Sequence, residues 1–406
     1  MSSWIAPGGF FADPDFDFGA RIALGAAAAG VGDAGPVLAT LDGIIDGDPQ
    51  SWFDAWCAVA KDTAARGEAA VADGHLRTGR WALLAAAQYW AKALDMVDGL
   101  ADQSVLLPTF TQHRRCWEGV VDASEGCYVR VDIPFEPVPM PGWLLRPDAS
   151  GAARPTLIMT NGSDGSLPSM LSYGASEALA RGWNAFVFDG PGQQSLLFEH
   201  GVPFRHDWEA VLTPVIDVLS ARDDVDAAAL TGYGISQGGY WQIRALAFEH
   251  RLVAAVADPG VVDVSTSWFA NIPEELVALL DSGDRDTFNK IMTAGMQENP
   301  GLARTLSFRA RPYGLLDDPF ALFTEVRKYT VADVVDTITT PVLVLDPEDE
   351  QFWPGQAQQV YDLLPGPKDI ATFGRGQGAN FHCQPLGRQL TNAVMFDWLE
   401  DRLRSV

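Results

Sequence analysis

The sequence predicts a mixed α/β fold, with a mostly parallel sheet that has helices on both faces and an all-helical N-terminal domain. From Tyr128 onward, short apolar runs bounded by Gly, Asp and Pro alternate with helical stretches, as buried parallel strands and their crossovers do. Before Tyr128 the apolar residues follow helical spacing instead. We therefore divide the 406-residue chain into a helical domain at 1–127 and an α/β core at 128–406.

Two helices stand out in the N-terminal domain. At 79–100, apolar side chains surround the helix almost completely, which is typical of a helix buried between others. The second helix, at 48–65, opens with Asp and Pro and carries Trp52 and Trp56 on one side. These aromatic residues are first of all core residues, and an apolar pocket for a ligand is the alternative.

Eight strands are expected in the core, of which the first two, 129–136 and 140–147, form an antiparallel pair. The other six are expected at 155–162, 184–190, 228–234, 252–258, 341–346 and 369–373. The chain between the last residue of 252–258 and Pro341 is too long for a simple crossover. We interpret 261–340 as an enlarged crossover with helices of its own.

The composition excludes several classes of partner. With 28 basic and 53 acidic side chains the formal net charge is −25, which argues against nucleic acid and anionic membrane surfaces. No stretch reaches the roughly 18 apolar residues of a membrane helix, and the N-terminus lacks the basic start of a secretory signal. We expect no membrane association and a cytoplasmic location. The four cysteines show no metal-binding spacing, so neither a metal nor another cofactor is expected.

The segment 232–239, GYGISQGG, carries the strongest signal for chemistry. It lies between an apolar strand and a helical stretch, where a Gly-x-Ser-x-Gly turn exposes its serine as a nucleophile. Gly234 and Gly238 are small enough to let strand and helix approach. Ser236 is therefore the candidate nucleophile, and a merely tight glycine turn is the alternative.

A serine nucleophile needs a histidine base and a carboxylate that orients it. In sites built on this turn the chain order is serine, acid, histidine. His382 is the only histidine after His250, and it lies between the last expected strand and the final helix. These features favour His382 as the base.

The acid is sought in the segment 346–350, DPEDE, which follows an expected strand. In many such loops the acid lies four residues before the proline that opens the next helix, and this spacing selects Glu350. Asp349 is one step away, and Asp346 at the strand end could instead brace the loop. Asp258, at the end of the preceding strand, is a further alternative.

The oxyanion of an acyl-transfer intermediate needs backbone N–H donors. The residue after the nucleophile, Gln237, offers the first. The loop 161–166, NGSDGS, offers the second through Ser163 or Asp164, unless it is an ordinary turn. The loop 188–194, FDGPGQQ, lacks the Lys-Ser/Thr of a phosphate-binding loop and is interpreted as a turn that borders the site.

Together with IPFEPVPMPGWLLRP (133–147) and EQFWPGQ (350–356), these segments resemble the α/β-hydrolases. The resemblance is to the branch with an N-terminal helical cap, which includes 2,6-dihydroxypseudooxynicotine hydrolase and fungal polyketide-shortening hydrolases. It covers the chain from about 130 to the end and, more weakly, the helical stretch ending QYWAKAL (88–94). It implies an eight-stranded hydrolase fold and a triad between cap and core, carried over as Ser236, the Glu350 loop and His382. The family usually has aspartate as the acid, so this chain departs there.

The resulting hypothesis is a serine hydrolase that cleaves an ester, a thioester, an amide or a carbon–carbon bond next to a ketone. Its expected partner is a bulky apolar or aromatic acyl substrate, and the net charge favours a neutral or cationic one. The enlarged crossover would help to cover the active site, and the cap offers a surface for a homodimer. One alternative is a biosynthetic acyl transferase or cyclase that excludes water. Another is a non-catalytic small-molecule-binding protein of the same fold.

Overall fold

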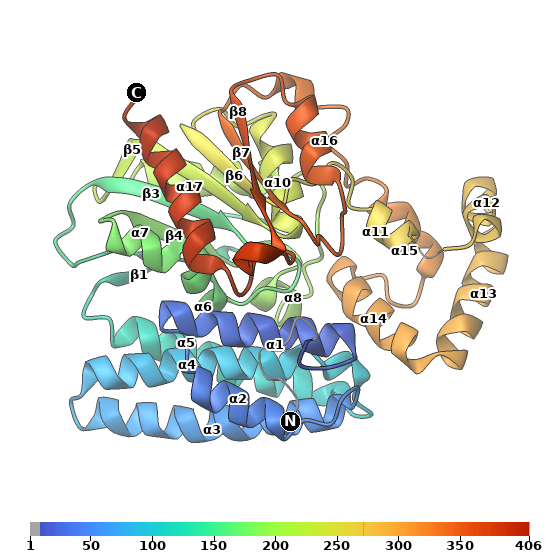
Figure 1. Ribbon diagram of the computed structural model, residues 1–406, viewed down its shortest axis with the longest axis horizontal. Helices are drawn as coiled ribbons and strands as arrows, with labels where there is room; N and C mark the ends of the chain where they lie inside the picture. Colours follow the sequence, from blue (N-terminus) through green and yellow to red (C-terminus); the bar gives the residue numbers. More distant parts are fainter. Residues whose placement is uncertain (1–8, 271, 406) are drawn as a thin grey trace. The chain divides into compact units, whose positions relative to one another are not determined.

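An eight-stranded sheet forms the centre of the computed structural model, which describes residues 9–270 and 272–405 (Figure 1). The strand order is β1-β2-β4-β3-β5-β6-β7-β8, with β2 antiparallel to β4 and the pairs from β4 to β8 parallel. All eight expected strands are present. Their bounds are β1 Tyr128–Ile133, β2 Met140–Leu145, β3 Arg154–Thr160, β4 Asn184–Phe188, β5 Val225–Ile235, β6 Ala254–Asp258, β7 Val342–Pro347 and β8 Lys368–Phe373.

The central strands are buried on both faces. Every residue of β4 and of β6 is buried, which explains why these strands read as continuous apolar runs rather than as alternating patterns. Helices cover both faces of the sheet (Figure 1). They include α7 Ser176–Ala180, α9 Glu209–Ser220, α10 Gln237–Leu246, α16 Gln356–Leu363 and α17 Arg388–Leu403, and the short helix α8 Gln194–Phe198 follows β4.

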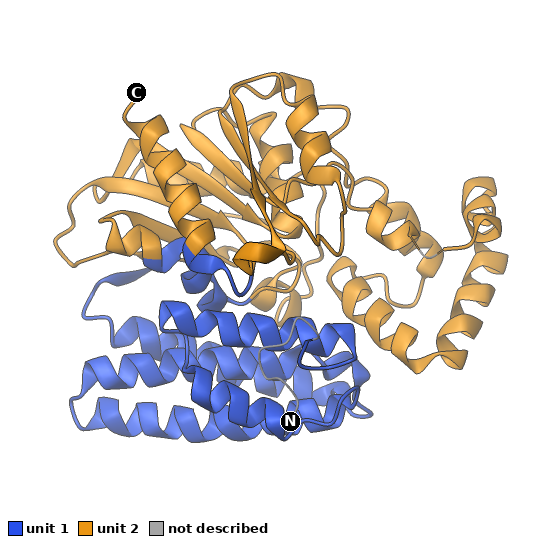
Figure 2. Ribbon diagram, in the orientation of Figure 1, with its two compact units in different colours: residues 1–129, 166–176, 385–389 blue, residues 130–165, 177–384, 390–406 orange. Residues whose placement is uncertain are grey.

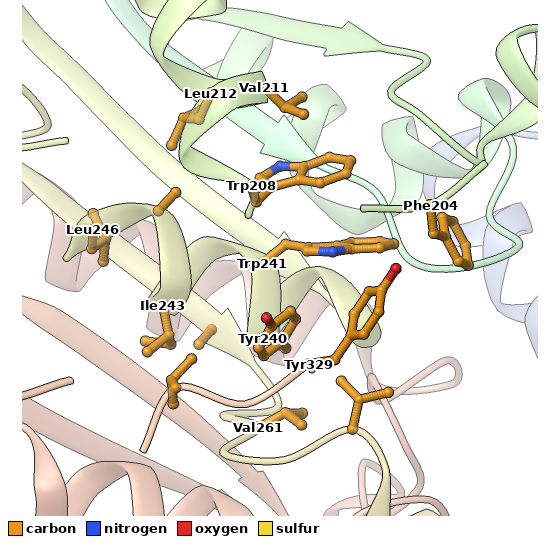
Figure 3. Close-up of a cluster of buried hydrophobic side chains, with 14 of the residues drawn as sticks. Phe204, Trp208, Val211, Leu212, Tyr240, Trp241, Ile243, Leu246, Val261 and Tyr329 are labelled. Atoms are coloured by element: carbon orange, nitrogen blue, oxygen red, sulfur yellow. The ribbon is translucent and has the colours of Figure 1, made fainter. Parts of the chain in front are cut away.

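Aromatic stacking joins α10 to the residue that precedes α9. The indole rings of Trp208 and Trp241 lie nearly parallel, with their centroids 4.3 Å apart (Figure 3). Phe204 meets the edge of the Trp241 ring at 4.9 Å. Such pairs add to the free energy already gained by burying the rings. They anchor the helix that begins directly after Ser236.

The strand register brings three chain segments to one edge of the sheet. Thr160 at the end of β3 lies beside Gly234 of β5, and Ile235 lies beside Asp258 of β6. In parallel sheets the loops that follow such strand ends are where ligands bind. The candidate site lies at this edge.

The described chain forms two compact units (Figure 2). Unit 1 contains the residues up to 129 together with 166–176 and 385–389, and unit 2 contains 130–165, 177–384 and 390–406. The expected helical domain, 1–127, falls inside unit 1. Each unit has a hydrophobic core of its own.

Unit 1 is built from long helices. They are α1 Pro14–Ala26, α2 Ala34–Asp42, α3 Pro49–Ala72, α4 Leu76–Leu94 and α5 Leu106–Asp122. Helix α3 starts where expected, because the Asp48 side chain accepts the N–H of Gln50. A Cβ on Gly67 would come within 2.9 Å of Leu83 Cγ, so the glycine lets α3 and α4 pack closely.

The ends of these helices differ from the sequence-based expectation. Helix α3 continues past 65 to Ala72, through alanine-rich sequence with high helix propensity. The helix expected at 79–100 begins earlier, at Leu76, and ends at Leu94. Asp95 follows and accepts from the Lys92 ammonium at 2.6 Å. An apolar pattern does not mark helix ends.

Helices fill the enlarged crossover between β6 and β7. They are α11 Thr266–Phe269, α12 Glu274–Ser282, α13 Arg285–Glu298, α14 Pro300–Ala310 and α15 Pro319–Val326. Asp284, Asn299 and Asp318 each accept a backbone N–H of the helix that follows, which is the usual way to start a helix. Among the described residues, no helix has both the length and the apolar character needed to cross a membrane.

Candidate active site

Ser236 occupies a strained turn between β5 and α10. Its φ is 58° and its ψ is −127°, a conformation that non-glycine residues adopt only when their surroundings enforce it. A Cβ on Gly234 would lie 2.1 Å from the carbonyl oxygen of Gly238, and one on Gly238 would lie 2.5 Å from that of Thr160. Only glycine fits at these two positions. The turn therefore has the geometry expected of a nucleophile elbow.

The imidazole of His382 reaches the hydroxyl of Ser236. Nε2 of His382 and Oγ of Ser236 are 2.8 Å apart. His382 lies in the loop between β8 and α17 and is 2% exposed. The sheet thus brings together two residues that lie 146 positions apart in the chain.

Glu350 holds the other nitrogen of the ring. Its two carboxylate oxygens lie 2.8 and 2.9 Å from His382 Nδ1. Oε1 also accepts the backbone N–H of Phe352, at 2.9 Å, and that of Trp353, at 3.2 Å. When Nδ1–H donates to Glu350, Nε2 is left as the acceptor for the Ser236 hydroxyl.

The pKa values of this pair move in opposite directions. Burial disfavours the charged form of Glu350, but the His382 ring and the two loop N–H groups outweigh it and lower the pKa of Glu350. Burial likewise acts to lower the pKa of His382, and the Glu350 charge and hydrogen bond overcome it and raise that pKa. The pair is thus suited to an ionised carboxylate beside a basic imidazole.

The other candidate acids have different partners. Asp349 accepts from Arg375 Nε and from Asn380 Nδ2, both at 2.6 Å, and these bonds lower its pKa to about 2. Burial, followed by the nearby Glu350 charge, raises the pKa of Asp346 at the end of β7. The Asp258 carboxylate accepts from Tyr233 and Gln384. Within 9–270 and 272–405, no cluster of His, Cys, Asp and Glu is suited to hold a metal ion.

The loop 161–166 lies against the nucleophile. A Cβ on Gly162 would come within 2.9 Å of Ser236 Cβ. The N–H of Gly162 donates to Asn161 Oδ1 at 2.8 Å, and Ser163 and Asp164 follow it in the loop. The N–H of Gln237 belongs to the first turn of α10, where N–H groups have no acceptor within the helix.

Gln193 braces this loop, and sequence reasoning missed it. Its Nε2 donates to the carbonyl oxygens of Asn161 and Gly162, both at 2.9 Å, and its Oε1 accepts the N–H of Gly190. The segment 188–194 was expected only to border the site. A glutamine in a glycine-rich turn carries no signal of its own, because its role depends on a loop about 30 residues earlier in the chain.

Aromatic side chains lie next to Gln237 and next to His382. Tyr313, from the enlarged crossover, lies beside the Gln237 side chain, and burial raises the pKa of its phenol. Its ring is 5.2 Å from that of Phe204 and 5.6 Å from that of Trp268. On the histidine side, the Phe352 ring meets the His382 ring edge to face at 4.7 Å. The sequence indicated that the crossover approaches the site, but it did not single out these residues.

Curated hydrolases of fungi are similar to this chain in sequence. Hydrolase acrC of Aspergillus aculeatus is 33% identical over 288 residues, which cover 64% of this chain and 67% of that protein. Hydrolase LUC6 of a Fusarium species is 27% identical over 387 residues, covering 91% and 92%. The 20-hydroxy-prefusarin hydrolase FUS2 of Gibberella moniliformis is 30% identical over 276 residues, covering 64% and 66%. No family model matches the chain.

Solved structures share the fold. The 2,6-dihydroxy-pseudo-oxynicotine hydrolase superposes with a TM-score of 0.73 at 19% identity, over 93% of this chain and 95% of that one. AbyA5 superposes with a TM-score of 0.61 at 18% identity, over 90% and 89%. Each of these two structures shares the fold of this chain at low sequence identity. With the sheet order, the serine turn and the identity to acrC, these findings show that the chain belongs to the α/β-hydrolase family of enzymes.

Proposed function

We propose that this enzyme is a serine hydrolase with Ser236 as nucleophile, His382 as general base and Glu350 as the triad acid. The observation that carries the proposal is the continuous hydrogen-bond path from Ser236 Oγ to His382 Nε2 and from Nδ1 to Glu350, with contacts of 2.8 to 2.9 Å. A serine hydroxyl becomes reactive at neutral pH when such a base accepts its proton. The strained conformation of Ser236 supports the same role.

The proposed reaction has two halves. His382 accepts the proton of Ser236 while Oγ attacks the substrate carbonyl, and the tetrahedral oxyanion forms hydrogen bonds with the N–H of Gln237 and with that of Ser163 or Asp164. The bond to the leaving group then breaks and His382 protonates that group. His382 next accepts a proton from water, which attacks the acyl-serine. The bond between the acyl carbon and Oγ breaks, His382 returns the proton to Oγ, and the acid is released. Glu350 stays ionised and stabilises the imidazolium in both halves.

The proposed substrate is a bulky apolar or aromatic small molecule with a carbonyl group. Tyr313 beside Gln237, with the rings of Phe204 and Trp268 packed against it, and Phe352 beside His382 support this class. The relatives named for a substrate act on 20-hydroxy-prefusarin and on 2,6-dihydroxy-pseudo-oxynicotine. We also propose that residues 1–127 form a helical cap and that residues 128–406 form the catalytic core. A homodimer and a cytoplasmic location remain predictions.

A second candidate function is acyl transfer within the substrate, which would close a ring. The burial of His382, at 2% exposure and next to the rings of Phe352 and Trp353, favours it, because a base shielded from water is suited to a reaction that excludes water. Turnover in water enriched in oxygen-18 separates the two. Hydrolysis places the label in the released acid, and ring closure leaves the product unlabelled.

Labelling by a fluorophosphonate probe tests the proposal. The wild-type protein is expected to label at one site, Ser236→Ala to lose the label, and His382→Ala and Glu350→Ala to label much more slowly. Ser282→Ala is the matched control, since this exposed serine caps a carbonyl of α12 and is open to the same reagent. It is expected to label like the wild type.

Two outcomes contradict the proposal. If the wild type stays unlabelled while it remains folded, Ser236 is not an activated nucleophile. A non-catalytic small-molecule-binding protein of this fold is then the better hypothesis. If Ser236→Ala still labels at the wild-type rate, the reactive group lies elsewhere.

A further inference from the structure

Asp258 contacts both segments that carry the proposed nucleophile and base. It ends β6, lies beside Ile235 in the sheet and is fully buried. Its backbone carbonyl accepts the N–H of Ser236 at 2.6 Å and the thiol of Cys383 at 3.1 Å. One carbonyl oxygen thus binds the nucleophile itself and the residue that follows His382.

The carboxylate of Asp258 repeats this arrangement with side chains. Oδ2 accepts the hydroxyl of Tyr233 at 2.6 Å, and Oδ1 accepts Nε2 of Gln384 at 2.8 Å. Tyr233 lies on β5, three residues before the nucleophile, and Gln384 lies two residues after His382. Both side chains are fully buried, so water does not compete for these hydrogen bonds.

We infer that Asp258 is a positioning residue, which ties the turn that carries Ser236 to the loop that carries His382 and thereby sets the distance between Oγ and Nε2. The inference rests on the proposed function of these two residues. Their 146-residue separation means that no local turn can hold them together. Asp258 supplies two contacts to each side, one from the backbone and one from the side chain.

The chemistry of a carboxylate explains why aspartate suits this position. Burying a charge is unfavourable unless hydrogen bonds compensate it, and here a phenol and an amide donate to it from opposite segments. An ionised carboxylate only accepts, so it takes both donors at once. Asparagine has one accepting oxygen and one donating nitrogen, and the Gln384 amide would have to turn around to restore the second contact.

The charge of Asp258 also acts on His382. Burial acts to lower the pKa of His382, and the negative charges of Glu350, Asp258 and Asp164 act to raise it, that of Glu350 the most. Removing the Asp258 charge leaves the other two in place. Asparagine at 258 is therefore expected to lower the pKa of His382 with little change in shape, whereas alanine also removes both side-chain contacts.

The test measures the rate of fluorophosphonate labelling of Ser236, resolved into the maximal rate constant kinact and the half-saturating probe concentration KI, from pH 5 to 9. Asp258→Ala is expected to lower kinact on the order of tenfold to a hundredfold, the scale for a misplaced catalytic group, with KI unchanged. Asp258→Asn is expected to lower kinact less and to move the acid limb of the pH profile to lower pH. A purely structural role would change neither the pH limb nor the split between kinact and KI.

The matched control is Asp224→Asn. Asp224 is also buried and charged, but it precedes β5 at the opposite end from Ser236 and pairs with Arg146 and Arg222. Its variant is expected to lose thermal stability while kinact and the pH limb stay at wild-type values. If Asp258→Ala does not fold, Tyr233→Phe, which deletes a single hydroxyl, takes its place and is expected to lower kinact several-fold.

The outcomes separate this inference from the proposed function. If the wild type labels and both Asp258 variants keep its kinact and its pH limb, Asp258 is not a positioning residue, although Ser236 remains the nucleophile. If the wild type itself does not label, the proposed function fails first. A shift of the acid limb in Asp224→Asn equal to that in Asp258→Asn would also overturn the inference.

Discussion

Two buried histidines, one in each compact unit, show how surroundings decide what a histidine does. His113 on α5 sits with Nδ1 2.8 Å from the carbonyl oxygen of Ala87, and burial lowers its pKa to about 4. His382 is just as enclosed, yet the Glu350 carboxylate outweighs burial and raises its pKa. Burial alone therefore keeps an imidazole neutral and inert. A buried carboxylate partner turns it into a base.

The largest expected effect comes from replacing one or the other of these two histidines. Replacing His382 with alanine removes the proposed base, and the rate of labelling or turnover is expected to fall by up to about 10⁶-fold, the scale seen when a triad member is lost. His113→Gln is the matched change, since it also replaces a fully buried ring. Its rate per folded molecule is expected to equal that of the wild type. Equal losses in the two variants would contradict the assignment of His382.

The next effect concerns the partner of His382. Glu350→Gln keeps the shape of the side chain but removes its charge and no longer holds His382 in the correct tautomer. We therefore expect kcat to fall by about 10⁴-fold. Asp349→Asn is the control, because Asp349 pairs with Arg375 at the surface. Steady-state kinetics on one ester measures both variants. If the rate falls in Asp349→Asn and survives in Glu350→Gln, the acid is misassigned.

The stability of the protein is expected to depend on His113. Its pKa is about 4 in the folded protein against the usual 6.5, so between these values the unfolded chain binds more protons. The contribution of His113 to the free energy of unfolding is fully present above pH 6.5. About 3 kcal/mol of it is expected to be lost as the pH falls to 4. Urea titrations of the wild type and of His113→Gln at pH 7 and pH 4.5 measure it.

The comparison of the two proteins isolates the titration of His113. Glutamine does not titrate, so the difference in stability between wild type and His113→Gln is expected to shrink on acidification. An unchanged difference would mean that His113 is protonated in the folded state as readily as in the unfolded one.

The smallest expected effect is the pH limb of catalysis. The proposed base, His382, can accept a proton only when it is neutral, and its pKa is raised, so kcat/KM is expected to fall with decreasing pH through a midpoint above the usual 6.5. Glu350→Gln removes the main cause of the raised pKa and should move the midpoint of any residual activity to lower pH. A wild-type midpoint below 6.5 would contradict the raised pKa.

Much of the fold could be predicted from the sequence. All eight strands were expected within a few residues, because strands buried on both faces read as apolar runs between turn residues. The helix ends were less accurate, as α3 and α4 show. A helix ends where capping and tertiary contacts stop it, and these contacts leave a weak mark in the sequence.

The candidate site could be predicted in part. The strained serine turn follows from glycine spacing, since sterics between neighbouring residues act locally. The choice of Glu350 came from its distance to the next proline, and in the structure its carboxylate is the one that meets His382 Nδ1. The bracing role of Gln193 left no recognisable pattern.

The sequence by itself determined the succession of strands and helices along the chain, the shape of the serine turn and the family resemblance. Only the tertiary structure decided which groups face one another: Glu350 with His382, and Asp258 with both the serine turn and the histidine loop. The physical reason is range. Backbone sterics and apolar periodicity act over a few residues, whereas these contacts join residues up to 126 positions apart, which come together only when β5, β6, β7 and β8 are laid side by side.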